Sequence, residues 1–219
     1  RGLRQFAKEG LVRLEYGGAV LNDGSLFEYN MAMKKGQNQK EKQAIARKSL
    51  EFIKDGGSIF LDAGTTVNEI AKLLINRRNL NVITNSLLVA NTLSKAAHIR
   101  LLMCPGVFRE TSMAFMGQMT DSFVDQFSID VLFLGVEGVG LDKGLTVPDI
   151  TDGSTKRHLT EKAKKVVCLA DSVKFSKSFF YQICDFDSVD ALITDANLEH
   201  PLEEKYLAEG IPLIRAEDK

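Results

Sequence analysis

A regular alternation of short apolar runs and amphipathic segments constrains the fold of this chain most strongly. Apolar runs at residues 58–62, 81–84 and 99–103 are separated by helical patterns at 67–76 and 87–97. Strands that are apolar throughout are typical of a parallel sheet covered on both faces. The sequence therefore predicts an α/β fold, with a mainly parallel sheet flanked by helices on both faces.

The second half of the chain continues this pattern. Strands are expected at 130–135 and 166–170, with a helix at 149–165 between them that Thr151 or Asp152 would cap. Apolar side chains recur at helical spacing over residues 111–127, which predicts one helix packed in the core or against another subunit. Further elements are expected as a helix at 40–54, short strands at 141–148, 179–184, 191–194 and 212–214, and a helix at 201–208.

Polar residues follow three of the predicted strands, in the turns at 62–66, 84–86 and 105–109. In the first turn, the opening N–H groups of the next helix have no internal partner and favour an anion. Gly64 suits a tight turn, and Thr65 or Thr66 can cap the helix or offer a hydroxyl to a ligand. Because the carboxyl ends of parallel strands meet at one edge of a sheet, these turns predict a ligand site, although a purely structural cap is the alternative.

Composition restricts the classes of function. The 219 residues are 44% hydrophobic and carry a net charge of −1, so the chain as a whole is not a polyanion-binding surface. The three cysteines lie in apolar runs without CxxC spacing, which favours buried thiols in a reducing cytoplasm. The three histidines are dispersed, so no metal site is expected, and no apolar run is long enough for a membrane span.

The N-terminal stretch carries the one local signal of nucleic-acid binding. Four of the first thirteen residues are cationic, namely Arg1, Arg4, Lys8 and Arg13. The alternative is a solvated helix face. A short helix and a strand leading into Gly17 and Gly18 predict a hairpin, and because the chain starts inside a helix without Met we expect that it continues a longer protein.

The order of motifs LDAGTT, VITNS, PGVFR, FLGVEGV, GLT, STKR, LADSVKF and LITD resembles the effector domain of the DeoR family of bacterial transcriptional repressors. Residues 1–20 resemble the end of the recognition helix and the wing of that family's winged helix-turn-helix. The resemblance implies a DNA-binding remnant at 1–20, a linker at 21–39 and an effector domain at 40–219. The implied fold is that of ribose 5-phosphate isomerase, glucosamine 6-phosphate deaminase and CoA transferases.

The resemblance also implies a function. It predicts a cytoplasmic, homo-oligomeric repressor of a sugar-metabolism operon that binds operator DNA and a phosphorylated sugar, without a cofactor. Carried over residue by residue, the effector site would comprise Asp62, Gly64, Thr65, Thr66, Thr84, Asn85, Ser86, Gly106, Arg109, Lys156 and Lys174. The helix N-terminus, hydroxyls and cations suit phosphate oxygens, whereas Asp62 and Asn85 suit sugar hydroxyls. Pro105 and residues 149–154 depart from the family pattern and could alter which sugar fits.

A sugar-phosphate isomerase or deaminase on the same scaffold is the alternative. By resemblance to the isomerases, the position of their catalytic glutamate is taken by Thr155, which cannot accept a proton near neutral pH. A CoA transferase is the remaining alternative, and Glu137 would be its nucleophile. Retained anion-binding residues without a general base favour a sensor over an enzyme.

Overall fold

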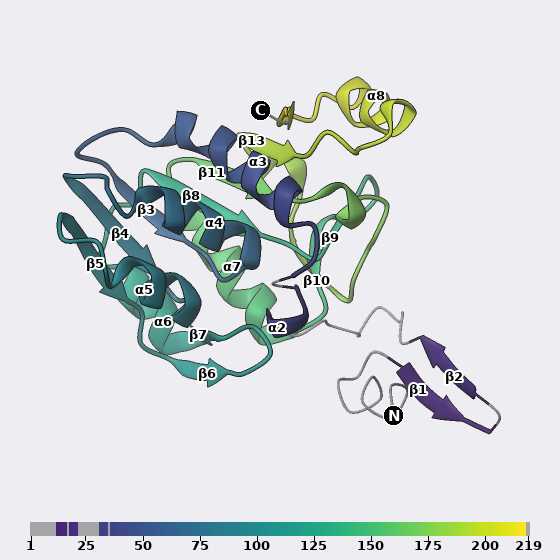
Figure 1. The fold of residues 1–219 in the computed structure, drawn as a ribbon, viewed down its shortest axis with the longest axis horizontal. Helices are drawn as coiled ribbons and strands as arrows, with labels where there is room; N and C mark the ends of the chain where they lie inside the picture. Colours follow the sequence, from purple (N-terminus) through teal and green to yellow (C-terminus); the bar gives the residue numbers. More distant parts are fainter. Residues whose placement is uncertain (1–11, 17, 22–30, 35, 218–219) are drawn as a thin grey trace.

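A seven-stranded sheet forms the centre of the molecule (Figure 1). The computed structural model describes residues 12–16, 18–21, 31–34 and 36–217. Every neighbouring pair of strands in this sheet is parallel, as the sequence predicted. The strand order is β14 (Leu213–Arg215), β13 (Ala191–Thr194), β11 (Val166–Leu169), β8 (Val131–Gly135), β3 (Ser58–Leu61), β4 (Leu80–Thr84) and β5 (Ile99–Met103).

Three helices cover one face of this sheet. They are α3 (Gln39–Ser49), α4 (Thr65–Leu74) and α5 (Leu87–Leu93). Ile45, Ile70 and Val89 from these helices are buried in one cluster with Ile59 and Val82 of the sheet. The alternation of strand and helix seen in the sequence therefore produces this half of the core.

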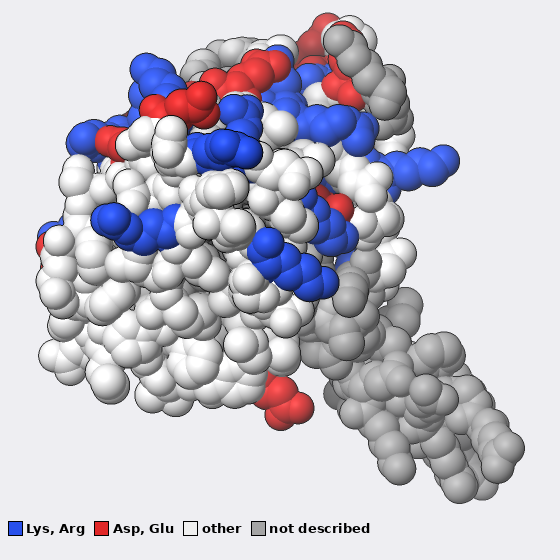
Figure 2. Space-filling model, turned by 60° about the vertical axis from the view of Figure 1, so that its left-hand side comes forward, with Lys and Arg blue, Asp and Glu red and all other residues white. Residues whose placement is uncertain are grey.

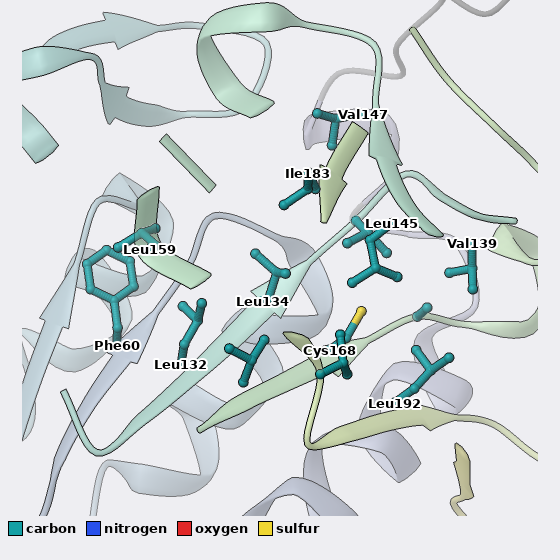
Figure 3. Close-up of a cluster of buried hydrophobic side chains, with 14 of the residues drawn as sticks. Phe60, Leu132, Leu134, Val139, Leu145, Val147, Leu159, Cys168, Ile183 and Leu192 are labelled. Carbon is teal, nitrogen blue, oxygen red and sulfur yellow. The ribbon is translucent and has the colours of Figure 1, made fainter. Parts of the chain in front are cut away.

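The opposite face is covered by helices and by a second, smaller sheet. The helices are α6 (Gln118–Val124), α7 (Ile150–Lys162) and α8 (His200–Ala208), and the antiparallel sheet has the order β12 (Tyr181–Cys184), β10 (Gly144–Val147) and β9 (Gly138–Gly140). Figure 3 shows Leu134 and Cys168 of the large sheet pointing toward Leu145 and Ile183 of the small one. The sequence pattern predicted the helices but not this additional layer.

Residues 111–127 do not form the single helix that was expected. They contain β7 (Ala114–Met116), which pairs antiparallel with β6 (Val107–Arg109), and then α6. Gly117, at φ 96°, separates the strand from the helix. Ala114 and Met116 are both buried, as alternate residues of a strand are. Over so short a segment the sequence pattern of a strand cannot be distinguished from that of a helix.

The starts of two helices also differ from expectation. Asp149 caps α7, since its carboxylate accepts a hydrogen bond from the backbone N–H of Asp152 at 2.8 Å, so neither predicted cap is correct. In α4 the N-cap residue is Gly64, and no side chain caps the helix. Thr65 and Thr66 are therefore the first residues of α4 rather than its caps.

A hairpin and a short helix precede α3. The expected hairpin is present as β1 (Val12–Glu15) paired antiparallel with β2 (Gly18–Leu21), and α2 (Met31–Lys34) lies within the stretch expected to be a linker. Arg1, Arg4 and Lys8 lie outside the described residues, and Arg13 lies in β1. Among the helices of the described ranges, none combines the length and apolarity that crossing a bilayer requires.

Candidate functional site

A pocket lies at the carboxyl ends of β3 and β8, where the order of the sheet reverses. From β3 the chain proceeds outward through β4 and β5, and it then returns to the other side of β3 as β8. In open parallel sheets this switch point is where the connections diverge and leave a crevice for ligands. The pocket is lined by the start of α4, the ends of β8 and β11, α7, and the segment that precedes α3.

A buried ion pair forms the floor of this site. Lys156 on α7 donates to Oδ2 of Asp62, which also accepts the backbone N–H of Gly135 at 3.1 Å. The Lys156 ammonium lies 3.6 Å from a carboxylate oxygen of Asp152. Burial lowers the pKa of Lys156, but the carboxylates of Asp152 and Asp62 outweigh it and raise the pKa above its usual value. Lys156 is therefore a permanent cation held between two carboxylates.

A second charged cluster lies around Glu137, just after β8. Its two carboxylate oxygens accept hydrogen bonds from Lys34 on α2 and, at 2.6 Å, from Lys174 after β11. Burial raises the pKa of Glu137, but the two ammonium groups outweigh it and hold the pKa at about 2. Glu137 is therefore ionised at all physiological pH values, and it draws two lysines to the wall of the pocket.

Several buried oxygens near the pocket have no hydrogen-bond partner among the described residues. They are Oδ1 of Asp62, Oγ of Ser112 and Oδ1 of Asp171. Buried polar atoms are nearly always paired in native proteins, so unpaired ones indicate a site that a polar molecule completes. Carboxylate and hydroxyl oxygens accept hydrogen bonds from the hydroxyl groups of a sugar or from water.

The structure brings together only part of the set that the sequence suggested. Gly64, Thr65, Thr66, Lys156 and Lys174 line the pocket. Asp62 lies directly behind them, bonded to Lys156. These residues combine the N-terminus of α4 with two lysines, and both features attract an anion.

The turn after β4 does not line this pocket. Thr84 Oγ1 donates to the backbone oxygen of Leu61 at 2.6 Å and accepts the N–H of Ser86 at 3.0 Å. Ser86 in turn caps α5. The backbone oxygen of Asn85 accepts the N–H of Phe115 in β7, while its buried amide has no partner among the described residues. This turn therefore fastens the β6–β7 hairpin and α5 to the sheet.

Gly106 and Arg109 also lie outside the pocket lining. A Cβ atom at Gly106 would lie 2.5 Å from Thr120 Oγ1, so this position needs glycine for close packing. Arg109 Nε lies 3.5 Å from a carboxylate oxygen of Asp149, the cap of α7. Both residues thus have structural roles in this arrangement.

The pocket residues that the sequence analysis missed include four polar residues around the start of α3. Lys34, Gln37 and Asn38 precede α3, and Lys42 lies in it. Their segment is polar and weakly periodic, so the pattern suggested a linker. The one available signal was its three closely spaced lysines, at 34, 35 and 40, and polar linkers commonly carry such charges.

Thr155, which by resemblance stands where the isomerases carry their catalytic glutamate, has a structural role. Thr155 is buried, and its hydroxyl accepts the backbone N–H of Gly117 at 3.0 Å. Glu137, the candidate nucleophile of a transferase, is held by two ammonium groups. Across the described ranges, no three His, Cys, Asp or Glu side chains gather as metal ligands.

Comparisons with known proteins agree with a regulatory protein. The family model described as the DeoR C terminal sensor domain matches residues 37–196. The glycerol-3-phosphate regulon repressor of Escherichia coli K12 is 34% identical over 90% of this chain and 77% of its own length. The transcriptional regulator IolR of Bacillus subtilis is 30% identical over 94% of this chain and 80% of its own length.

Solved structures were compared with this chain for their fold. The delta subunit of eIF2B from Chaetomium thermophilum matches with a TM-score of 0.52 and 17% identity, over 74% of this chain and 57% of that one. Ribose 5-phosphate isomerase from Methanocaldococcus jannaschii matches with a TM-score of 0.49 and 20% identity, over 64% and 56% respectively. This chain thus spans little more than half the length of these two structures, and the first likeness shows the fold alone.

Proposed function

The chain belongs to the DeoR family of transcriptional regulators, and we propose that its pocket binds a phosphorylated sugar that controls operator binding. The observation that carries the proposal is that groups suited to a phosphate and groups suited to hydroxyls lie together at the switch point of the sheet. The N-terminus of α4 and Lys174 suit a phosphate group, whereas the unpaired oxygens of Ser112 and Asp171 in the pocket lining suit hydroxyl groups. A sugar phosphate carries both kinds of group in one molecule.

The effector acts by its different affinity for two arrangements of the repressor. A ligand shifts an equilibrium only as far as it binds one state more tightly than the other. The operator would be bound through the N-terminal region, where Arg1, Arg4, Lys8 and Arg13 stay predicted DNA contacts. Whether the sugar phosphate induces or co-represses transcription is decided by which arrangement it favours.

Thermal unfolding in the presence of candidate ligands tests the site. A panel of sugar phosphates, with glycerol 3-phosphate included, is compared with the unphosphorylated parents, since a ligand of the folded state raises its stability. We expect one phosphorylated compound to raise the melting temperature while its parent does not. Lys174→Gln should weaken the binding of that compound about tenfold, because a charge-assisted hydrogen bond is lost.

A matched control and two outcomes make this test decisive. Lys48→Gln removes a lysine near the end of α3 whose ion pair with Glu51 lies at the surface, and the ligand affinity of this variant should equal that of the original chain. Equal stabilisation by phosphorylated and parent compounds would contradict the phosphate site. Turnover of the bound sugar phosphate would instead support the isomerase alternative.

We also propose that the repressor is a homo-oligomer. Figure 2 shows that the side on which α5, α6 and the β6–β7 hairpin lie in Figure 1 carries few charged side chains. Val107 and Met119 are 71% and 63% exposed there. Met119→Lys should shift sedimentation toward the monomer, whereas Leu207→Lys, at an exposed apolar position on α8, should not. Unchanged sedimentation of both variants would contradict this interface.

A further inference from the structure

The segment before α3 is bound to the rim of the pocket rather than lying apart from it. This α2 segment comprises Met31–Lys34 and residues 36–38. The backbone N–H of Met31 donates to the oxygen of Thr111 at 2.9 Å, and the Met31 side chain is buried. The α2 segment therefore packs on the loop that leads into β7.

Polar contacts connect the same segment to the charged groups of the pocket. Lys34 donates to Glu137, and Nδ2 of Asn38 donates to Asp171 at 3.1 Å. Asn38 has a left-handed backbone, at φ 49°, which asparagine tolerates better than most residues. Glu137 and Asp171 both line the pocket, so these contacts end within the site itself.

A buried lysine of α3 holds the turn between these two contacts. Lys42 Nζ donates to the backbone oxygens of Lys34 and Gln37, each at 2.6 Å. Lys42 is 4% exposed and also lines the pocket. The position of the α2 segment is therefore coupled directly to a cation in the site.

We propose that the α2 segment is a ligand-dependent strap that completes the effector site through Lys34 and passes the state of the site toward the N-terminal region. This inference rests on the proposed function of the same pocket. Met31, Lys34, Gln37 and Asn38 form one wall, and that wall exists only while the strap is docked.

The coupling follows from linkage. An anion at the start of α4 gains the ammonium of Lys34 only in the docked state, so it binds that state more tightly. By reciprocity, the anion then stabilises docking by the same factor. Since the strap lies between β2 and α3 in the chain, its docking changes the tether of the N-terminal hairpin to the effector domain.

Hydrogen exchange of the whole chain, with inorganic phosphate as the probe, tests the strap. The variants are Lys34→Gln and the matched control Lys48→Gln. In the original chain and the control, phosphate should slow exchange both at residues 65–67 and at residues 31–34, by about fivefold or more. In Lys34→Gln, slowing at 65–67 should remain while slowing at 31–34 is lost, and phosphate should bind about fivefold more weakly.

Three results would overturn the proposal, and they separate it from the site itself. Slowing at 65–67 without any change at 31–34 in the original chain removes the strap and leaves the site intact. Unchanged phosphate affinity in Lys34→Gln does the same. No slowing at either place removes both the site and the strap.

A second variant guards against a folding defect in the first. Asn38→Gly retains the left-handed backbone and deletes only the contact with Asp171. It should weaken phosphate binding in the same direction as Lys34→Gln, because both contacts hold the same wall. Equal affinity of Asn38→Gly and the original chain counts against the strap.

Discussion

The turns after β3 and β4 look alike in the sequence but have different roles in the structure. Each follows a buried parallel strand and places small polar residues before a helix. Gly64, Thr65 and Thr66 open onto the pocket, whereas Thr84 and Ser86 are buried and bonded to backbone groups. Residue type at a strand end therefore does not decide whether the turn lines a pocket.

The difference arises from the neighbours of each strand. β3 lies beside β8, to which the chain returns after building the β4 and β5 side, so the connections on its two sides diverge. β4 lies between β3 and β5, and the β6–β7 hairpin packs against its end through the contact of Asn85 with Phe115. The site follows the switch point of the sheet, and the second turn is closed by the hairpin.

Removing the cation beneath the first turn should produce the largest effect. Lys156→Ala leaves Asp62 buried without its counter-ion, since both side chains are almost fully inaccessible. Breaking a buried pair from one side typically costs about 3–5 kcal/mol. Urea unfolding should show this loss, because the buried carboxylate of Asp62 is left without its ammonium partner.

An exposed ion pair on the same helix supplies the control. Lys162 contacts Asp125 at 2.8 Å, and both side chains are 41% exposed. Lys162→Ala should cost less than about 1 kcal/mol. Equal losses in the two variants would mean that the first turn is not built around the buried pair.

The pH dependence of the unfolding free energy should report the ionisation of Glu137, which lines the pocket beside the turn after β3. Its pKa falls from 4.5 to about 2 on folding, so the ionised form stabilises the folded state. This contribution is complete above the unfolded pKa and is lost as pH falls from about 5 to about 2, with a size of about 3 kcal/mol.

Glu137→Gln isolates this contribution from those of the other carboxylates. Urea unfolding at several pH values should show a shallower acid loss in the variant, with the difference confined to that range. Parallel acid profiles of the two proteins would show that Lys34 and Lys174 do not hold Glu137 in solution.

Gly106 lies outside the pocket lining, so a change there should affect stability but not ligand binding. In Gly106→Ala, the new Cβ would meet Thr120 Oγ1 at 2.5 Å and the backbone oxygen of Met116 at 2.8 Å, at a φ of 149°. We expect a loss of about 1–3 kcal/mol in unfolding free energy and unchanged ligand affinity. Gly117→Ala, at φ 96° with open space around it, should cost about 1 kcal/mol. Weakened ligand binding in Gly106→Ala would return this residue to the site.

The sequence predicted the parallel sheet because period and apolarity act locally. It also predicted that Gly64, Lys156 and Lys174 belong to one site, since the resemblance fixes these positions by motif order, and the three residues line the same pocket. It could not separate the turn at Thr84 from the turn at Gly64, because the hairpin that closes the former depends on pairing between β6 and β7. Lys34 was missed for the same reason, since its partner Glu137 is distant in the chain and the lysines close to Lys34 are common in polar linkers.

The smallest effects should separate the two turns most cleanly. Ser86 accepts the N–H of Val89 as the cap of α5, so Ser86→Ala should cost about 1 kcal/mol in unfolding free energy and leave ligand affinity unchanged. Thr66 lines the pocket and caps nothing, so Thr66→Ala should change stability by less than about 0.5 kcal/mol and weaken the ligand about tenfold. Urea unfolding measures the stability of both variants, and ligand titration measures their affinity. If Ser86→Ala weakens the ligand as much as Thr66→Ala does, the two turns share one site, and the hairpin does not close the second turn in solution.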